Sequence, residues 1–324
     1  MILVTGAAGF IGAALCERLL KDGHTVLGID NLNNYYDPKL KQARLERLKS
    51  PNWQFIKLDI ADRAGMERLF TEHHIARVIH LAAQAGVRHS VTHPHVYIDS
   101  NITGFLHILE GCRHAQIPHL LYASTSSVYG ASTRYPFSED DPCDQPIALY
   151  GATKRSNELM AHAYSHLYSF ATTGLRFFTV YGPWGRPDMA LFKFTENILK
   201  NQPIEVFNKG HMLRNFTYID DVVEGIVRLL NQPGQGSRLF NLGSPKSTQL
   251  LDYIHEIEKN TGKKAVLKLM PMQPGDIAQN PADTHRLTEA TGFTPQVSVQ
   301  EGVKKFVEWY LRFAPPKNEP RGLN

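Results

Sequence analysis

The chain has 324 residues, which is enough for one large α/β domain joined to a smaller lobe. Hydrophobic residues make up 42% and charged residues 20%, an ordinary globular composition that excludes a disordered or fibrous chain. The net charge of +4 comes from lysines and arginines that alternate with acidic residues, so no nucleic-acid partner is expected.

Cysteine, apolar and histidine patterns narrow the setting of the protein. The three cysteines are widely separated and form no CxxC pair, which predicts a reduced, cytoplasmic chain. His80 and Gln84 interrupt the apolar stretch 78–87, and no run approaches the roughly 20 apolar residues of a membrane helix. His162 and His166 have helical i,i+4 spacing but lack an HExxH pattern, so no metal site is expected.

Short apolar strands alternate with helical patterns through the first half of the chain. Ile2–Thr5 predicts the first strand, residues 10–21 the first helix and Thr25–Ile29 the second strand. Further strands are expected at 54–58, 77–81, 119–123 and 173–178. This alternation is typical of βαβ units, so the expected fold is a doubly wound, Rossmann-like parallel sheet.

The pattern changes after about residue 180. A helix is expected near 189–200, and short strands near 204–207 and 214–219 follow it. Next come a helix near 220–230, a strand at 238–242 and a helix near 248–260. We therefore expect two units, a first domain of residues 1–180 with returns near 215–245, and a smaller α/β lobe of residues 181–214 and 246–324.

A glycine series directly follows the first strand and opens the first helix. Gly6, Gly9 and Gly12 leave backbone instead of side chains in the turn, and Phe10 and Ile11 begin the helix. Free N–H groups and the helix dipole at such a turn favour the pyrophosphate of a dinucleotide. The strand–turn–helix context predicts a dinucleotide site in addition to a tight turn.

An acidic residue at the end of the second strand selects between cofactors. Asp30 can accept hydrogen bonds from an adenosine ribose and would repel a 2′-phosphate, which favours NAD over NADP. Since such sheets bind ligands at the carboxyl ends of their strands, the candidate cofactor set also includes Asn31, Asp59, Ile60, Leu81, Ala82, Ala83, Asn101 and Ser124. For Ala82 and Ala83, packing between helix and sheet is nearly as good an explanation.

Three residues carry the candidate chemistry. Tyr150 and Lys154 stand four residues apart at the start of a helical pattern, so both side chains project on one face. A neighbouring ammonium favours tyrosinate and lowers the phenol pKa, which makes Tyr150 a candidate general base. Thr125 follows the fifth strand at the same edge of the sheet and can hydrogen-bond the reacting hydroxyl. Thr125, Tyr150 and Lys154 are the candidate catalytic residues. Tyr150 and Lys154 also complete the candidate cofactor-binding set.

The glycine series, Asp30, the hydroxyl run 124–127 and the Tyr150/Lys154 pair resemble the extended short-chain dehydrogenase/reductase family over essentially the whole chain. Within it, residues 176–190 are similar to UDP-glucuronate 4-epimerases, supported by segments 83–88 and 31–38. The resemblance implies a first domain that binds NAD, a second lobe that binds a UDP-sugar, and a homodimer formed through helices near 94–115 and 151–170.

The resemblance also implies a reaction, the reversible epimerisation of UDP-glucuronate to UDP-galacturonate at C4. Tyr150 would remove the C4 hydroxyl proton while hydride moves to bound NAD, which gives a transient 4-keto sugar. Return of the hydride to the opposite face would invert C4 and restore NAD. Thr125 would guide the hydroxyl proton, and Lys154 would also hold the nicotinamide ribose.

The 4-keto intermediate is a β-keto acid, so an epimerase must keep its carboxylate from leaving as carbon dioxide. Ser126, Ser127, Thr179 and Arg186 are the candidate carboxylate contacts. For Arg186 a diphosphate contact or a structural role is the alternative, because arginine binds carboxylate and phosphate alike. The family pattern places the remaining candidate UDP contacts at Arg88, Lys193, Phe207, Arg214 and Asp276. Lys193 also fits a solvated helix face, and Phe207 a core position.

Several related activities compete with this one. The residues after the catalytic threonine resemble Asp-Glu in 4,6-dehydratases and Ser-Glu in UDP-glucuronate decarboxylases, whereas Ser126 and Ser127 stand here. A UDP-galactose 4-epimerase stays an alternative, although the basic Arg186 fits an anionic sugar better. A decarboxylase and a non-catalytic NAD sensor remain as further alternatives. The intact Tyr150, Lys154 and Thr125 argue against the sensor.

Overall fold

The computed structural model describes residues 1–273 and 276–313. Pro274 and Gly275, which precede the candidate Asp276, lie outside the described residues, as does 314–324 at the end of the expected second lobe. In the part of the chain that is described, none of the helices has the length and apolar character to cross a membrane.

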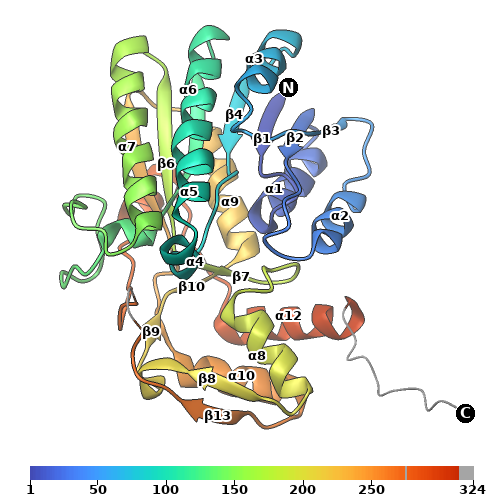
Figure 1. Ribbon diagram of the computed structural model, residues 1–324, viewed down its shortest axis with the longest axis vertical. Coiled ribbons are helices and arrows are strands. Elements are labelled where there is room, and N and C mark those ends of the chain that lie inside the picture. Colours follow the sequence, from blue (N-terminus) through green and yellow to red (C-terminus); the bar gives the residue numbers. More distant parts are fainter. Residues whose placement is uncertain (274–275, 314–324) are drawn as a thin grey trace, which may run out of the picture.

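A parallel sheet forms the centre of the molecule (Figure 1). Its strands lie in the order β11-β6-β5-β4-β1-β2-β3. Strands β2 and β3 extend the sheet on one side of β1, whereas β4 pairs with β1 on the other side and the later strands follow it there. The bounds are β1 Ile2–Thr5, β2 Val26–Asp30, β3 Trp53–Lys57, β4 Arg77–His80, β5 His119–Thr125, β6 Ala171–Phe177 and β11 Ser237–Leu242. The expected doubly wound, Rossmann-like fold is confirmed.

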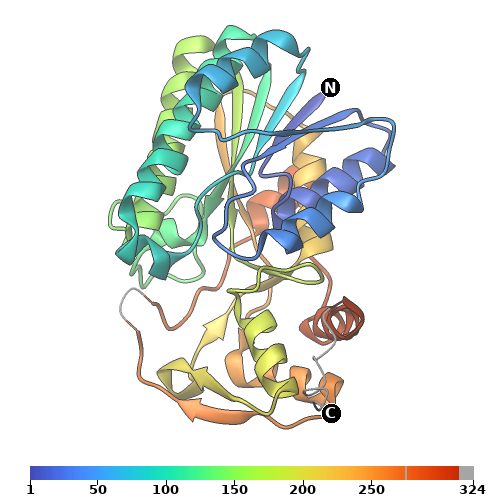
Figure 2. The ribbon, with the colours of Figure 1, turned by 45° about the vertical axis from the view of Figure 1, so that its right-hand side comes forward.

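Helices cover both faces of this sheet (Figure 2). On one face lie α3 (Arg63–Glu72), α6 (Gly104–His114) and α7 (Leu149–Tyr168), whose apolar side chains share one cluster with the inner strands. On the other face lie α1 (Phe10–Lys21) and α9 (Ile219–Leu230), with α2 (Pro38–Glu46) beside α1. Strands β1, β2 and β6 are buried along their whole length because helices cover them from both sides.

The helix expected near 94–115 is built from several pieces. Helices α4 (Val87–Thr92) and α5 (Pro94–Tyr97) precede a wide π-type turn at Ile98–Thr103, and α6 continues from it. Pro94 starts α5 because proline is tolerated in a first helical turn but cannot continue a helix from before. The wide turn carries Asn101 into the interior.

The second lobe lies beyond the carboxyl ends of the central strands (Figure 1). It contains α8 (Ala190–Leu199), β8 (Pro203–Val206), α10 (Leu250–Thr261), β13 (Val266–Leu269) and α12 (Val299–Phe313). Strands β8 and β13 pair in parallel. The other short strands are β7 Thr179–Tyr181, β9 Leu213–Arg214, β10 Phe216–Tyr218 and β12 Thr248–Gln249, and a short helix, α11, spans His285–Thr291. Two 3₁₀ turns lie at Ser126–Tyr129 and Phe207–Gly210.

The strand expected at 214–219 is wrong as one element, because the chain divides it. Strand β9 pairs with β12 and strand β10 pairs with β7, so the two halves belong to different sheets. The backbone N–H of Asn215, at the break, donates to Asn280 Oδ1 at 2.9 Å. Ile219 already belongs to α9.

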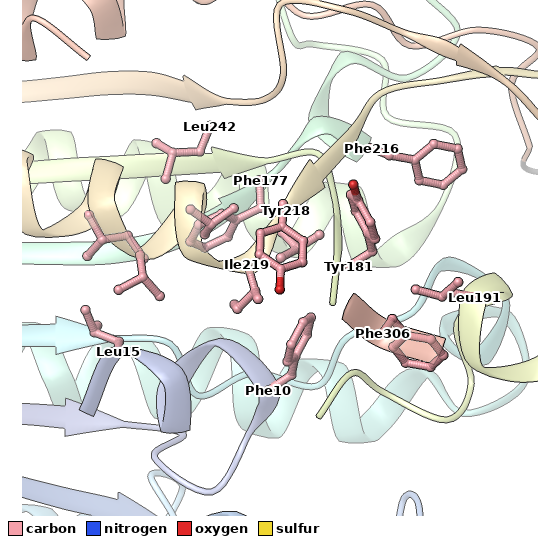
Figure 3. Close-up of a cluster of buried hydrophobic side chains, with 14 of the residues drawn as sticks. Phe10, Leu15, Phe177, Tyr181, Leu191, Phe216, Tyr218, Ile219, Leu242 and Phe306 are labelled. Carbon is pink, nitrogen blue, oxygen red and sulfur yellow. The ribbon is translucent and has the colours of Figure 1, made fainter. Parts of the chain in front are cut away.

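One hydrophobic cluster connects the sheet with the second lobe. Figure 3 shows it running from Phe10 and Leu15 on α1, past Ile219 on α9, to Leu191 on α8 and Phe306 on α12. The chain returns to the sheet through α9, which packs on α1, and through β11. The division into residues 1–180 with returns near 215–245, against 181–214 and 246–324, stays a prediction.

Candidate active site

A cavity of about 510 Å³ lies at the carboxyl ends of the central strands. Its walls come from the glycine loop, the ends of β2, β4 and β5, the start of α7 and the segment 177–189. Most candidate residues line it, namely Gly6, Gly9, Phe10, Ile11, Gly12, Asp30, Asn31, Asp59, Ile60, Leu81, Ala82, Ala83, Ser124, Thr125, Ser126, Ser127, Tyr150, Lys154, Thr179, Arg186 and Asp276.

The glycine loop has no room for side chains. Gly6 adopts a left-handed φ of +70°, which disfavours other residues. A Cβ at Gly12 would lie 2.0 Å from the carbonyl oxygen of Gly6, and one at Gly9 would lie 2.9 Å from the same atom. The start of α1 therefore presents backbone at the cavity wall, as the pyrophosphate of a dinucleotide requires.

Asp30 and its neighbours form a polar edge beside this loop. Asp30 Oδ2 accepts the N–H of Ala8 at 3.2 Å, and Oδ1 accepts the N–H of Leu32 at 2.8 Å. The Nδ2 of Asn31 donates to Asp59 Oδ2 at 2.9 Å. These bonds hold both carboxylates at the ends of β2 and β3, where an adenosine ribose would meet them.

The end of β4 approaches the glycine loop closely. The N–H of Ala82 donates to Thr5 Oγ1 at 3.0 Å, and the same hydroxyl bonds His80 Nδ1 at 2.8 Å. A Cβ on Gly6 would lie 2.8 Å from the backbone nitrogen of Ala82. Ala82 both lines the cavity and packs against the hydrophobic cluster.

Asn101 lies behind the cavity wall instead of lining it. Its side chain accepts the N–H of Gln84 at 2.8 Å and donates to the carbonyl of Gln84 at 3.0 Å, which fixes a wall residue in place. Its backbone carbonyl accepts Asn157 Nδ2, and Asn157 Oδ1 in turn accepts Lys154 Nζ at 2.7 Å. Asn101 therefore acts on the site through Gln84 and Lys154.

Tyr150 and Lys154 lie on the first two turns of α7, with Thr125 at the end of β5. Burial lowers the pKa of Lys154 to about 7, while Glu158 opposes this shift. Burial raises the pKa of Tyr150, against smaller lowering effects from the Thr125 hydroxyl and the Arg186 charge. The expectation of a lowered pKa for Tyr150 is wrong for this structure, because burial of the phenol is the largest effect on its pKa and raises it.

Several hydroxyl side chains line the same cavity as Tyr150. Thr125 Oγ1 donates to Ser127 Oγ at 3.3 Å and accepts the N–H of Ser127 at 3.2 Å. Ser126 and Ser127 begin a 3₁₀ turn directly after β5, and Thr179 begins β7. Two chain segments thus supply four neutral hydroxyls to the cavity wall.

Arg186 also lines the cavity, but its guanidinium already pairs with a carboxylate of the protein, that of Asp188. Its Nε donates to Asp188 Oδ1 at 3.0 Å, and the hydroxyl of Tyr35 donates to Asp188 Oδ2 at 3.2 Å. This ion pair supports the alternative that Arg186 has a structural role. Asp188 and Tyr35 also line the cavity and were not among the candidates.

The other UDP candidates form a group around Asp276. Arg214 Nη2 donates to Asp276 Oδ1 at 2.8 Å, and Arg88 Nη2 lies 3.7 Å from Asp276 Oδ2. The Arg88 guanidinium stacks 4.7 Å from the ring centroid of the half-buried Phe207. Of this group only Asp276 lines the cavity itself. Lys193 is exposed on α8 and is not brought to the cavity.

Sequence reasoning also missed Arg44 of α2. This fully buried arginine donates to the carbonyl of Ala8 at 3.1 Å, to the hydroxyl of Tyr36 at 2.6 Å and to the carbonyl of Trp184 at 2.7 Å. It thereby ties the glycine loop to the turn that carries Arg186. The segment 31–38 was noted as a family feature, but an arginine eight residues beyond Tyr36 forms no local motif.

Known proteins share this arrangement. Residues 2–243 match the model of the NAD-dependent epimerase/dehydratase family. This chain belongs to that family. A probable UDP-glucuronate 4-epimerase of Rhizobium meliloti is 45% identical to this family member, over 95% of this chain and 96% of the relative.

Two solved structures are similar to this epimerase/dehydratase family member. A Bacillus cereus UDP-glucuronic acid 4-epimerase, in complex with UDP-glucuronic acid and NAD, has a TM-score of 0.90 at 35% identity, covering 96% of this chain and 99% of that one. A UDP-glucose 4-epimerase of Thermotoga maritima, with UDP-glucose, has a TM-score of 0.87 at 31% identity, covering 96% and 98%. The suspected family and the NAD dependence are confirmed.

Proposed function

We propose that this protein is a UDP-glucuronate 4-epimerase that interconverts UDP-glucuronate and UDP-galacturonate through a transient 4-keto sugar. The observation that carries the proposal is that Thr125, Ser126, Ser127 and Thr179 line the same cavity as Tyr150, with serines in place of a carboxylic acid after Thr125. The named UDP-glucuronate 4-epimerases among its relatives support the choice of an acidic sugar.

The residues of the chain supply binding and proton transfer. NAD, when bound, accepts hydride from C4 and returns it. Tyr150 takes the proton of the C4 hydroxyl and gives it back, and Thr125 holds that hydroxyl in line. Lys154, fixed by Asn157 at 2.7 Å, holds the nicotinamide ribose. Ser124 and the candidate residues from Gly6 to Ala83 bind the remainder of the cofactor, and Asn101 positions the wall at Gln84.

The carboxylate of the sugar requires firm contacts, because a β-keto acid loses carbon dioxide when the breaking bond stands perpendicular to the carbonyl plane. Ser126, Ser127 and Thr179 supply neutral donors at the cavity wall. Hydrogen bonds from these donors hold the carboxylate near the carbonyl plane and keep it on the sugar. Arg186 contributes from the same end of the cavity.

The diphosphate and uridine extend from the cavity toward the second lobe. Arg214 and Arg88 both pair with Asp276 and offer the diphosphate its contacts. Phe207 and Lys193 would flank the uridine. In this assignment residues 1–180, with returns near 215–245, hold NAD, and residues 181–214 and 246–324 hold the UDP-sugar.

A UDP-galactose 4-epimerase is the second candidate, and one observation favours it. Because Asp188 already pairs with Arg186, the sugar end of the cavity is less positive than the sequence indicates. The similarity to the Thermotoga maritima enzyme is compatible with a neutral sugar. Both activities use the same Tyr150, Lys154 and Thr125.

We further propose a cytoplasmic homodimer. The three cysteines are free and buried, as in a reducing compartment. Large apolar side chains are exposed on the two helical segments that the family resemblance assigns to dimerisation, namely Ile98, Leu106, Leu159 and Leu167. Apolar surface of this kind marks contact sites between proteins where it is contiguous, and these side chains are therefore the ones to test for a subunit contact.

Proton NMR of the purified protein with UDP-glucuronate and no added reductant tests the proposed function. We expect UDP-galacturonate to accumulate without a pentose product. Tyr150→Phe should lower turnover by about three orders of magnitude while NAD stays bound. Conversion of UDP-galactose but not of UDP-glucuronate would establish the second candidate, and a pentose product would indicate a decarboxylase. A Tyr150→Phe variant that matches the wild type would remove Tyr150 as the base.

A further inference from the structure

The sugar end of the cavity contains an ion pair that is internal to the chain. Arg186 and Asp188 both lie between β7 and α8, and both line the cavity. Nε of Arg186 donates to Oδ1 of Asp188 at 3.0 Å, and Nη2 donates to Oδ2, so one fork of the guanidinium is filled. Although burial disfavours both charges, each partner shifts the pKa of the other toward the charged form.

Tyr35 fixes Asp188 from the other side. Its hydroxyl donates to Asp188 Oδ2 at 3.2 Å, and the Arg186 guanidinium lies 5.8 Å from the centroid of its ring. The ring of Tyr35 packs edge-on against His89 at 4.8 Å. Asp188 is therefore held in place by contacts from two chain segments about 150 residues apart, 31–38 and 182–189.

This pair changes how a sugar carboxylate meets Arg186. The two N–H groups of Arg186 that bind Asp188 cannot also bind a substrate carboxylate in the same bidentate way unless the bonds to Asp188 break. Lys41 and Arg44 also lie close enough to Arg186 for its charge to lower the pKa of each. Asp188 thus offsets a local excess of positive charge that would otherwise attract any anionic ligand.

We propose that Asp188 is a specificity-determining residue, an internal counter-ion that competes with the substrate carboxylate for Arg186 and so limits the preference for acidic over neutral UDP-sugars. The proposal rests on the proposed function, since it concerns the sugar end of the same site. Tyr35 acts as a positioning residue that keeps Asp188 on Arg186.

Two ligands that differ only at C5 test the proposal. UDP-glucuronate carries a carboxylate there and UDP-glucose a hydroxymethyl group, and calorimetry of NAD-loaded protein in a Tyr150→Phe background measures binding without turnover. We expect Asp188→Asn to tighten UDP-glucuronate binding about tenfold and to leave UDP-glucose within about twofold. The gain should shrink as salt rises.

Three further variants separate the charge effect from a structural one. Asp188→Glu keeps the negative charge and should restore wild-type selectivity. Tyr35→Phe keeps both charges and should shift the ratio of the two affinities less than Asp188→Asn does. Asp22→Asn makes the same charge change on the exposed end of α1, beside Arg18, and should change neither affinity.

Two results would overturn the proposal. Equal changes for both ligands would show that Asp188 only shapes the cavity, and weaker binding of UDP-glucuronate would show that Asp188 orients Arg186 for the substrate. The proposed function fails separately, if the wild type does not convert UDP-glucuronate, and the ratio of affinities remains measurable in that case.

Discussion

Burial changes the pKa of Lys154, an effect that its spacing from Tyr150 in the sequence does not reveal. It is 1% exposed, and its pKa falls to about 7 chiefly through burial. Its ordinary value is 10.5, so the unfolded chain keeps this proton over a range in which the folded protein has lost it. The unfolded state binds more protons there, and stability rises with pH.

Replacing Lys154 by methionine should remove this pH dependence. Between about pH 7 and 9, the free energy of unfolding of the wild type should rise relative to Lys154→Met by up to about 1.4 kcal/mol per pH unit. Urea unfolding of both proteins at several pH values in this window measures the difference. Parallel curves would mean that Lys154 keeps its ordinary pKa in the folded protein.

Some residues of the candidate site can be predicted from local sequence spacing, and others cannot. Tyr150 and Lys154 were found because i,i+4 spacing on one helix brings two side chains together without knowledge of the fold. The contacts of Arg44 with Trp184 and of Asp188 with Tyr35 were missed because these partners lie far away in the chain. The direction of the Tyr150 pKa shift was missed for the same reason, since burial is a property of the whole fold.

The turn between β1 and α1 depends on the absence of side chains. At Gly12 a Cβ would lie 2.0 Å from the carbonyl oxygen of Gly6, far inside van der Waals contact, and the obstructing atom is backbone. The turn would have to open, and the N–H groups at the start of α1 would leave the cavity wall.

Gly12→Ala should therefore abolish NAD retention and lower stability by about 2 kcal/mol or more. The matched control is Gly225→Ala on α9, where the nearest atom to an added Cβ is 3.5 Å away. That variant should keep its NAD and gain slightly in helix stability. Absorbance of released NAD and thermal unfolding report both effects. Normal NAD content in Gly12→Ala would contradict the assignment of this loop.

Regular elements followed from the sequence wherever one periodic pattern filled one element. Residues 10–21 form α1 as expected, and the inner strands of the sheet lie within a few residues of their expected ranges. The segment 214–219 differed because its two halves pair with separate strands, which apolar alternation cannot show. The region 94–115 differed because Pro94 and the wide turn at Ile98–Thr103 interrupt one helical pattern.

One hydrophobic cluster joins the central sheet to the second lobe. The apolar side chains of α1, α9, α8 and α12 belong to one continuous cluster, part of which Figure 3 shows. Arg44 adds buried hydrogen bonds between the glycine loop and the turn before Arg186. The cavity walls therefore come from segments that pack against each other directly, which suits a site that must bind a cofactor and a sugar at a set distance.

The surface of α7 leads to the last prediction, on assembly. Leu159 and Leu167 are 56% and 65% exposed, and they point away from the sheet on the helix whose first turns carry Tyr150 and Lys154. Arginine at both positions would place two charges in the proposed dimer contact, where they would have to lose their water. We expect Leu159→Arg/Leu167→Arg to be monomeric by light scattering at about ten micromolar, and the wild type to be dimeric at the same concentration.

A control on another exposed surface separates assembly from general solubility. Leu311→Arg adds a charge to α12, where the side chain is 41% exposed, and should stay dimeric. Because the walls of the cavity come from one chain, the monomeric double variant should keep its NAD and a measurable turnover. A monomeric wild type, or a double variant that remains dimeric, would place the subunit contact elsewhere or remove it.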